Sequence, residues 1–324
     1  MFNRSTRLIV VALALVVGVA QGANAAYPDR TVKIICPYAA GGNTDIIARI
    51  AADFLSKRLG QPFIVENRGG GGGTVGAGIA AAADPDGYTL LFGTAGSISV
   101  NPNLRKVKYD PNTDFTPVSN VVTSSMLIVV SPALGVNTLK ELIALASSGK
   151  QQINFASGGV GTTAHVGGVL LNEKAGNKMV HVPYKGAGDV INDLIAGRVQ
   201  VNVNNMPSFL PHLPTGELKA LAIAKETRSK LLPDVPTAAE AGLDDYVMGA
   251  WYGLMGPAGM PQEAVDALFK GLKAMEESKE IEEQYTKLGL DLAISESPAA
   301  FAQYMKDQLA WWGKVLDNPA FKSK

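Results

Sequence analysis

The chain has 324 residues, of which 47% are hydrophobic, and it carries 29 basic and 29 acidic side chains. This balance excludes the strongly basic surface that nucleic-acid-binding proteins present. The length is sufficient for one large domain or two α/β lobes. The single cysteine, Cys36, excludes an internal disulfide bond, and its apolar neighbours indicate a buried, unreactive thiol.

The N-terminal segment has the pattern of a secretory signal peptide. Arg4 and Arg7 precede an apolar run over residues 8–19, and residues 23–25 supply an A-x-A cleavage site. The run is shorter than the ~20 apolar residues that span a bilayer, and no later stretch approaches that length. We therefore expect cleavage after Ala25, which removes Arg4 and Arg7 and leaves an exported, soluble protein with 27 basic and 29 acidic side chains.

The first predicted strand leads into a loop that suits an anion. Residues 32–36 form a short apolar strand, and Gly41 and Gly42 precede a helix for which Asn43 or Thr44 is the expected N-cap. The N–H groups at a helix start point outward beside a partial positive charge, so they can bind an anion without an arginine. By itself the segment also fits an ordinary strand-to-helix turn.

The chain up to residue 93 alternates between strands and helices. A helix is expected over residues 49–58, a strand over 63–66, a small-residue helix over 77–83 and a strand over 88–93. Such an alternation predicts a parallel sheet. Five consecutive glycines at 69–73 lie between the second strand and its helix.

The rest of the chain predicts a second α/β half followed by a helical end. Two strands, 118–122 and 126–130, are expected with a break at 123–125, and they would suit a passage between two lobes. The remaining expected strands and helices are helix 138–148, strand 153–156, strand 179–183, helix 189–196, strand 199–203, strand 218–223 and helices 262–277, 279–288 and 299–316.

The motifs of catalytic and cofactor sites are weak or missing. Residues 71–76 satisfy G-x-G-x-x-G, but no acidic residue follows at the end of the next strand, so we expect a close-packed loop rather than a dinucleotide site. Ser157 is no nucleophile elbow, since Phe155 stands where glycine is required. The three histidines, His165, His181 and His212, lack metal-ligand spacing. We expect no enzyme, no cofactor and no metal.

Two glycine-rich loops carry the chemistry that remains. Residues 38–45 and 157–165 each place glycine N–H groups and a hydroxyl or amide side chain at a helix start. Facing each other across a cleft, they could hold a carboxylate. A helix end contributes about 0.3–1 kcal/mol per favourable charge contact, or about 2 when partly buried. Several such contacts with direct hydrogen bonds can reach micromolar affinity, which corresponds to about −8 kcal/mol.

A set of motifs runs in order along almost the whole mature chain and resembles the Bug family of periplasmic solute receptors, the binding components of tripartite tricarboxylate transporters. The motifs are Tyr27–Arg30, Pro37–Asp45, Val65–Arg68, Asp84–Leu91, Tyr109–Pro111 with Asp114–Phe115, Gly159–His165, His181–Gly186, Leu232–Thr237 and Gly256–Gly259.

This resemblance implies a type II periplasmic-binding-protein fold, an α/β fold of two lobes joined by two crossing strands, with a ligand cleft between them that closes by hinge motion. Lobe I would comprise residues 26–124 and 226–324, and lobe II residues 125–225. It implies a monomeric receptor that captures a small organic carboxylate and delivers it to integral-membrane transporter components. A ligand-presenting partner of a sensor protein is an alternative output.

The resemblance also implies a set of ligand-binding residues. They are Tyr38, Gly41, Gly42, Asn43 and Asp45 in the first loop, Ser97, then Ser157, Gly161, Thr162 and His165 in the second loop, and Tyr184, Asp189 and Asn204. A carboxylate in the first turn of a helix favours the helix and repels an anion, so bracing of the loop is the stronger expectation for Asp45. His165 is likewise expected to brace its loop.

Departures from the family pattern leave the cargo open. Residues 39–40 are alanines where proline or a bulkier residue is common, and Gly69 and Asp189 each replace a common proline. If Asp189 reaches the cleft, it disfavours a second carboxylate and favours a neutral or amino end. If it only caps the helix that follows, it says nothing about cargo. A receptor for a neutral or zwitterionic solute is therefore the alternative, and an enzyme is a weaker one.

Overall fold

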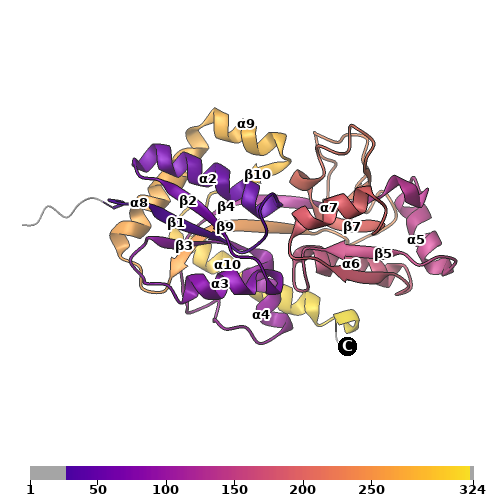
Figure 1. The fold of residues 1–324 in the computed structure, drawn as a ribbon, viewed down its shortest axis with the longest axis horizontal. Helices are drawn as coiled ribbons and strands as arrows, with labels where there is room; N and C mark the ends of the chain where they lie inside the picture. The colour runs from indigo at the N-terminus through magenta and orange to yellow at the C-terminus, as the bar shows by residue number, and fades with distance from the viewer. Residues whose placement is uncertain (1–26, 322–324) are drawn as a thin grey trace, which may run out of the picture.

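The computed structural model describes residues 27–321, so the predicted signal peptide lies outside the described residues. Figure 1 shows two lobes side by side along the long axis, each with strands between helices. A ten-stranded sheet system runs through both lobes. The two-lobed α/β architecture that the resemblance implies is confirmed.

Three parallel strands form the sheet of the first lobe, β1 (Val32–Cys36), β2 (Phe63–Asn67) and β3 (Thr89–Thr94), with β1 in the middle. The helices between them are α2 (Asn43–Leu59) and α3 (Thr74–Ala81). β1 and β3 are buried at most positions, which explains their nearly continuous apolar sequences, whereas the edge strand β2 leaves Ile64 exposed. The predicted parallel order is confirmed for these three strands.

One long strand, β4 (Phe115–Val130), carries the chain into the second lobe. The predicted break at residues 123–125 is wrong, because these residues pair with the start of β9 (Gly249–Pro257) and so stay in the ladder. β9 itself was not predicted. It returns the chain to the first lobe, where it pairs antiparallel with β3, so the sheet is mixed. The predicted boundary between 124 and 125 falls inside β4, and the exact lobe limits stay a prediction.

The second lobe repeats the strand–helix design. β5 (Asn154–Ser157) is parallel to both of its neighbours, β6 (Val180–Pro183) and β7 (Val201–Asn205). Here β4 pairs with β7 and with β8 (Lys219–Ile223). The helices of this lobe are α5 (Leu139–Ser148), α6 (Thr163–Lys174) and α7 (Ala187–Ile195). Because parallel strands end at one edge of a sheet, β1 and β5 both deliver their loops toward the other lobe.

Helices close the first lobe after β9. They are α8 (Gln262–Lys273), α9 (Lys279–Lys287) and α10 (Pro298–Leu316), with the short strand β10 (Leu290–Leu292) on β4. A π-helix over Ala95–Val100 leads into the short helix α4 (Asn101–Leu104). Within residues 27–321, none of the helices has both the length and the apolar character to cross a membrane.

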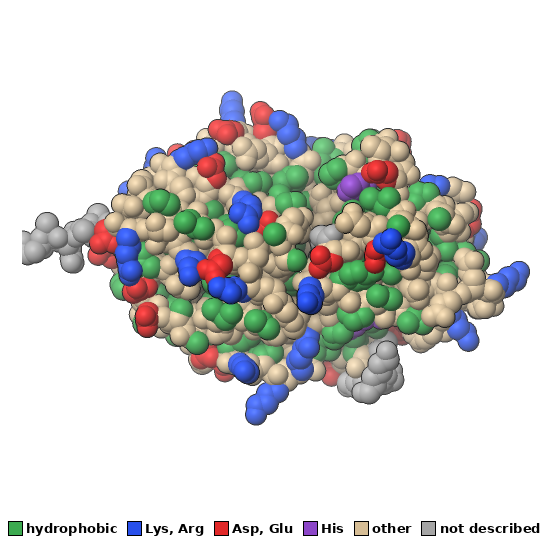
Figure 2. All heavy atoms as spheres, in the orientation of Figure 1, with side chains coloured by type: hydrophobic (Ala, Val, Ile, Leu, Met, Phe, Trp, Pro, Cys, Tyr) green, Lys and Arg blue, Asp and Glu red, His purple; other side chains and the backbone are tan. Residues whose placement is uncertain are grey.

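The surface mixes charges of both signs. Figure 2 shows basic and acidic side chains interspersed over the visible face. Many form exposed ion pairs, such as Lys57 with Asp53 on α2 and Arg30 with Asp86. Pairs of this kind contribute little stability, typically ~0–1 kcal/mol each. The fold instead rests on buried apolar clusters on both sides of the strands.

Candidate functional site

A small cavity lies between the lobes, where the starts of α2 and α6 approach each other. The volume that the centre of a water-sized sphere can occupy within the cavity is about 50 Å³. A single water needs ~10–15 Å³ by this measure, so the cavity can hold a small organic molecule or several waters. It is lined by Tyr38, Gly42, Asn43, Thr44, Thr94, Gly96, Gly158, Thr162, Thr163, Ala164, Asn204, Asn205, Ala250 and Tyr252.

The first-lobe wall of the cavity is the uncapped start of α2. Its N-cap is Gly42, with extended backbone and no capping side chain, so the prediction of Asn43 or Thr44 as N-cap is wrong. The physical reason is that the amide of Asn43 is engaged elsewhere, with its Oδ1 accepting from N (2.9 Å) and Oγ (2.7 Å) of Ser208. Among the described residues, the N–H groups of Asn43 and Thr44 have no acceptor.

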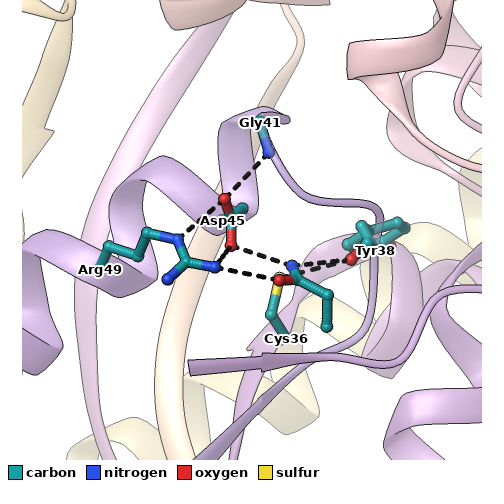
Figure 3. Close-up of polar contacts among 6 residues, drawn as sticks. Cys36, Tyr38, Gly41, Asp45 and Arg49 are labelled. Carbon is teal, nitrogen blue, oxygen red and sulfur yellow. Dashed lines mark hydrogen bonds and ion pairs between the residues drawn. The ribbon is translucent and has the colours of Figure 1, made fainter. Parts of the chain in front are cut away.

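Asp45 braces this wall from behind. Its carboxylate accepts hydrogen bonds from Gly41 N (2.9 Å), Arg49 Nε (3.0 Å) and Asn67 Nδ2 (2.9 Å), as Figure 3 shows for Gly41 and Arg49. Burial acts to raise the pKa of Asp45, but the hydrogen bonds from Arg49, Gly41 and Asn67 outweigh it and hold the pKa below its ordinary value. Asp45 and Gly41 do not line the cavity.

Cys36 lies next to this network and is fully buried. Burial raises the pKa of its thiol to about 12, against a smaller lowering by the hydrogen bond from Sγ to Tyr38 O. Since the thiolate is the reactive form, the thiol is inert at neutral pH. This agrees with the sequence-based interpretation of Cys36.

The second-lobe wall is the capped start of α6. Thr162 is its N-cap, with Oγ1 accepting from His165 N (3.1 Å) and donating to Gly159 O (2.8 Å). The N–H groups of Thr163 and Ala164 have no acceptor within the described part of the chain. Two helix starts therefore present free N–H groups to the same cavity, one from each lobe.

Several predicted residues support the second wall without lining the cavity. Ser157 Oγ lies 2.7 Å from His181 Nε2 and accepts from Gly159 N. His165 Nδ1 accepts from Gly161 N (3.4 Å), and the His165 ring lies 4.5 Å from the His181 ring. These contacts bring Ser157, Gly161 and His165 together as a brace beneath the loop.

Three further predicted residues also lie outside the lining. Ser97 is fully buried in the π-helix. Its side chain accepts from the backbone N–H of Thr94, and the Thr94 side chain accepts from the backbone N–H of Ser97. Tyr184 donates to Asp193 Oδ2 (2.7 Å). Burial, and to a smaller extent this hydrogen bond, raises the pKa of Tyr184 to about 12. Asp189 is exposed in the first turn of α7, whose N-cap is Gly186 without a side-chain cap, so the predicted capping by Asp189 is not observed and its contact with ligand stays a prediction.

Hydrogen bonds join the two lobes around the cavity. The fully buried Asn101 donates through Nδ2 to Gly72 O (2.9 Å) in its own lobe and to Gly161 O (2.8 Å) in the other. Arg105 reaches Val160 O from the same side. Asn43 also crosses, with Nδ2 3.3 Å from Asn204 Oδ1. The structure therefore has its lobes closed on each other.

The predicted close-packed loop of glycines forms part of this contact. Gly72 has a φ of +66°, and a Cβ there would lie 2.2 Å from Val160 O across the cleft. Gly73 similarly lies against the ring of Tyr38. Gly72 thus allows the lobes to approach, whereas Gly73 allows close packing on Tyr38 within the first lobe.

Charged side chains are missing from the described lining of the cavity. Its polarity comes from helix starts, from the hydroxyls of Thr44 and Thr163, and from amides. Burial raises the pKa of Tyr38 and of Tyr252, so both phenols are neutral hydrogen-bonding groups at physiological pH. The arrangement can hold an anion by dipoles and hydrogen bonds but offers no nucleophile–base pair.

Comparison with known proteins decides the family. Residues 47–320 match the sequence profile of the tripartite tricarboxylate transporter family receptor. The chain belongs to this family. It is 33% identical to protein BugT of Bordetella pertussis, over 92% of this chain and 92% of BugT. It is 35% identical to an Agrobacterium vitis UPF0065 protein from the TAR-I ttuE-ttuC' intergenic region, over 97% and 92%. The Bug-family resemblance is confirmed.

Solved structures of this receptor family share the fold. The periplasmic binding protein BugD superimposes with a TM-score of 0.86 at 34% identity, covering 90% of this chain and 98% of BugD. MatC (Rpa3494) from Rhodopseudomonas palustris with bound malate gives 0.85 at 32%, covering 90% and 100%. Rpa4515 of R. palustris with adipate gives 0.86 at 33%, covering 90% and 97%. The protein is a periplasmic solute-binding receptor and not an enzyme.

Sequence reasoning missed part of the receptor's cavity lining. Thr44, Thr94, Gly96, Gly158, Thr163, Ala164, Asn205, Ala250 and Tyr252 were not predicted. Thr44, Gly158, Thr163 and Ala164 lie inside the two predicted loops, residues 38–45 and 157–165, but were not singled out as ligand-binding residues. Asn205 repeats the polar signal of Asn204 at a strand end. Tyr252 lies on β9, which the apolar pattern did not reveal.

Proposed function

We propose that the receptor captures a small organic carboxylate between the starts of α2 and α6 and delivers it to the integral-membrane components of a tripartite tricarboxylate-type transporter. The observation that carries this proposal is the pair of helix starts, one from each lobe, whose free N–H groups line one cavity with no acidic side chain among its described lining residues. The receptors with malate and adipate, which are similar in sequence and structure, support a carboxylate as the cargo.

The mechanism follows from the position of the two walls. In an open form each helix start faces water. A carboxylate bound to one helix start also reaches the N–H groups of the other only when the lobes close. Binding then stabilises the closed form, in which Asn101 and Asn43 bridge the lobes. Because the grip is by dipoles and neutral groups, the cargo can also be released when the lobes separate.

A neutral or zwitterionic cargo is the second candidate, and the lack of a lysine or arginine in the described lining favours it. Thermal-shift and calorimetric titrations with mono-, di- and tricarboxylates, their amides and amino acids separate the two. We expect stabilisation by at least one acid and none by its amide at the same concentration. Stabilisation by amides alone would refute the carboxylate.

Two further parts of the proposal have their own measurements. N-terminal sequencing of the exported protein should begin at Ala26 if residues 1–25 are the signal peptide. Deleting the receptor gene should abolish uptake of the stabilising acid, and the transporter's membrane components should be needed for the same uptake. Uptake that persists without the receptor would refute the delivery role.

A further inference from the structure

One lining residue carries an unused acceptor. Asn205 ends β7, lines the cavity and is 3% exposed. Its side-chain Oδ1 is buried and accepts no hydrogen bond from any described residue. A buried carbonyl oxygen without a donor is costly, so this position favours a ligand that supplies one.

The surrounding network fixes which end of this amide is the acceptor. Asn205 Nδ2 lies 2.7 Å from Tyr252 Oη and 3.5 Å from Asn204 Oδ1. Asn204 Oδ1 is itself an acceptor, because Asn205 N (2.9 Å) and Asn43 Nδ2 (3.3 Å) donate to it. Turning the Asn205 amide over would bring its oxygen against Asn204 Oδ1, which has no hydrogen to give.

The other amide oxygens of the lining, those of Asn43 and Asn204, already accept hydrogen bonds, which singles out Asn205 Oδ1. Asn43 uses both ends of its amide to join the lobes. Asn204 Oδ1 receives two donors. Tyr252 Oη accepts from Asn205, so the phenolic hydrogen of Tyr252 is left to donate. An acceptor, Asn205 Oδ1, and a donor, Tyr252 O–H, therefore stand next to each other on the cavity wall.

We propose that this wall recognises a neutral group that both donates and accepts, a hydroxyl or a carboxamide carried by the ligand, with Asn205 as the specificity-determining residue. The inference rests on the proposed function, which assigns the ligand's carboxylate to the helix starts. A second carboxylate does not fit here, since it would set its lone pairs against Asn205 Oδ1 and no lysine or arginine among the described residues lines the cavity to compensate.

The test compares acids of one carbon skeleton that differ at a single position, which carries a hydrogen, a hydroxyl, a carboxamide or a carboxylate. Calorimetric titration of the wild-type receptor with short-chain sets should show the hydroxy or amide acid binding at least about tenfold tighter than the unsubstituted acid. The matched diacid should bind more weakly than the hydroxy acid.

Substitutions then assign the preference to Asn205. Asn205→Leu should bring the hydroxy-to-unsubstituted affinity ratio close to one while the unsubstituted acid still binds. Tyr252→Phe, which removes only the hydroxyl, should lower the same ratio. Asn202→Leu is the matched control, because Asn202 lies on the same strand with an unpartnered Oδ1 but does not line the cavity. Its ratio should equal that of the wild type.

The outcomes separate the two proposals. Equal wild-type affinity for the unsubstituted and hydroxy acids, or tighter binding of the diacid, overturns the inference and leaves the carboxylate function standing. An unchanged ratio in Asn205→Leu overturns the role of Asn205. If no acid of any set binds, the proposed function fails, and the inference fails with it.

Discussion

The two walls of the cavity both present free backbone N–H groups, but their helices begin differently. Both are helix starts after a parallel strand, but α6 has Thr162 as a side-chain cap, whereas α2 has only Gly42. In α6 one N–H, that of His165, is consumed by the cap. In α2 the polar side chain at the start, Asn43, leaves its own helix and bonds to the other lobe.

In the closed form, polar side chains of the first lobe therefore bind main-chain groups of the second. Asn101 and Arg105 donate to main-chain carbonyls of the second lobe, and Asn43 accepts from the main-chain N–H of Ser208. The second loop, residues 157–165, enters these bridges through the main-chain carbonyls of Val160 and Gly161, whereas Asn204 and Ser208 also contribute side chains. The function of this loop therefore depends on its backbone conformation and on the absence of bulky side chains, which sequence motifs based on side chains predict poorly.

The sharpest test of this division adds one methyl group to the second loop. Gly161 has a φ of +83°, and a Cβ there would lie 2.0 Å from Asn101 Oδ1. Gly161→Ala should block closure and lower ligand affinity by about 100-fold or more, equivalent to ~2.7 kcal/mol. Gly135→Ala is the matched control, with a φ of +75° but nothing within 4 Å of the added carbon.

Calorimetry for affinity and small-angle scattering for compactness read out both variants. Gly135→Ala should lose stability through backbone strain alone and keep its affinity. If Gly161→Ala bound and closed like the wild type, the described closed contact would not be the ligand-bound one.

Asp45→Asn tests the brace of the first wall. One of its carboxylate oxygens becomes a donor facing other donors, so we expect a loss of about 1–3 kcal/mol in the free energy of unfolding at pH 7. Asp53→Asn, at an exposed ion pair on the same helix, should change it by less than about 0.5 kcal/mol. Urea unfolding measures both.

The pH dependence of the same variant has a definite sign. The folded-state pKa of Asp45 lies below its ordinary value, which is about 3.9 when unfolded. Its stabilisation is thus complete above that pH and is lost as pH falls through the folded-state pKa. Between about pH 5 and pH 2 the wild type should lose more stability than Asp45→Asn. Parallel acid limbs would contradict this.

Asn43→Ala removes the crossing side chain of the first wall. The unliganded lobes can separate and hydrate Ser208, so thermal stability without ligand should change little. Ligand affinity should fall about tenfold, because the closed form loses its hydrogen bonds to Ser208 and Asn204. Asn103→Ala serves as control, since Asn103 bonds only within the first lobe, to Ser99 and Leu309. Equal affinities in the two variants would refute the bridging role.

The smallest effect is expected from the cap of the second wall. Thr162→Val should destabilise the protein by about 1 kcal/mol and also weaken ligand binding a few-fold, since the start of α6 frays. Thr138→Val removes the equivalent cap from α5, which does not line the cavity. It should have a similar cost in melting temperature and none in affinity. Loss of affinity in both variants would point to a global effect.

Local patterns predicted the parts of the fold that local chemistry determines. β1 was predicted with its observed limits, because Val32–Cys36 is apolar and followed by a turn. β9 was missed, since glycines at 249, 253 and 256 interrupt its apolar pattern and its place depends on pairing with β3 and β4. The break that was wrongly predicted in β4 has the same origin. Pairing with β9, and not the strand propensity of residues 123–125, keeps them extended.

The site divides in the same way. The helix-start loops are local features, so Gly42, Asn43 and Thr162 were predicted and do line the cavity. Tyr252 reaches the cavity only through β9. Asp189 could not be placed from the sequence, because a rotation of α7 decides whether its carboxylate meets ligand or water. Ligand contact by any of these residues stays a prediction.

The late return of β9 also sets an order for folding. β3 pairs with β1 on one side, but its other partner, β9, is synthesised long after it, since Leu91 pairs with Met255. β5, β6 and β7 lie closer together in the chain. During synthesis the second lobe can assemble while the first still has an unpaired strand edge. Contacts between distant segments form slowly, and exposed edges invite aggregation. We therefore expect the first lobe to be the one that needs protection before it folds.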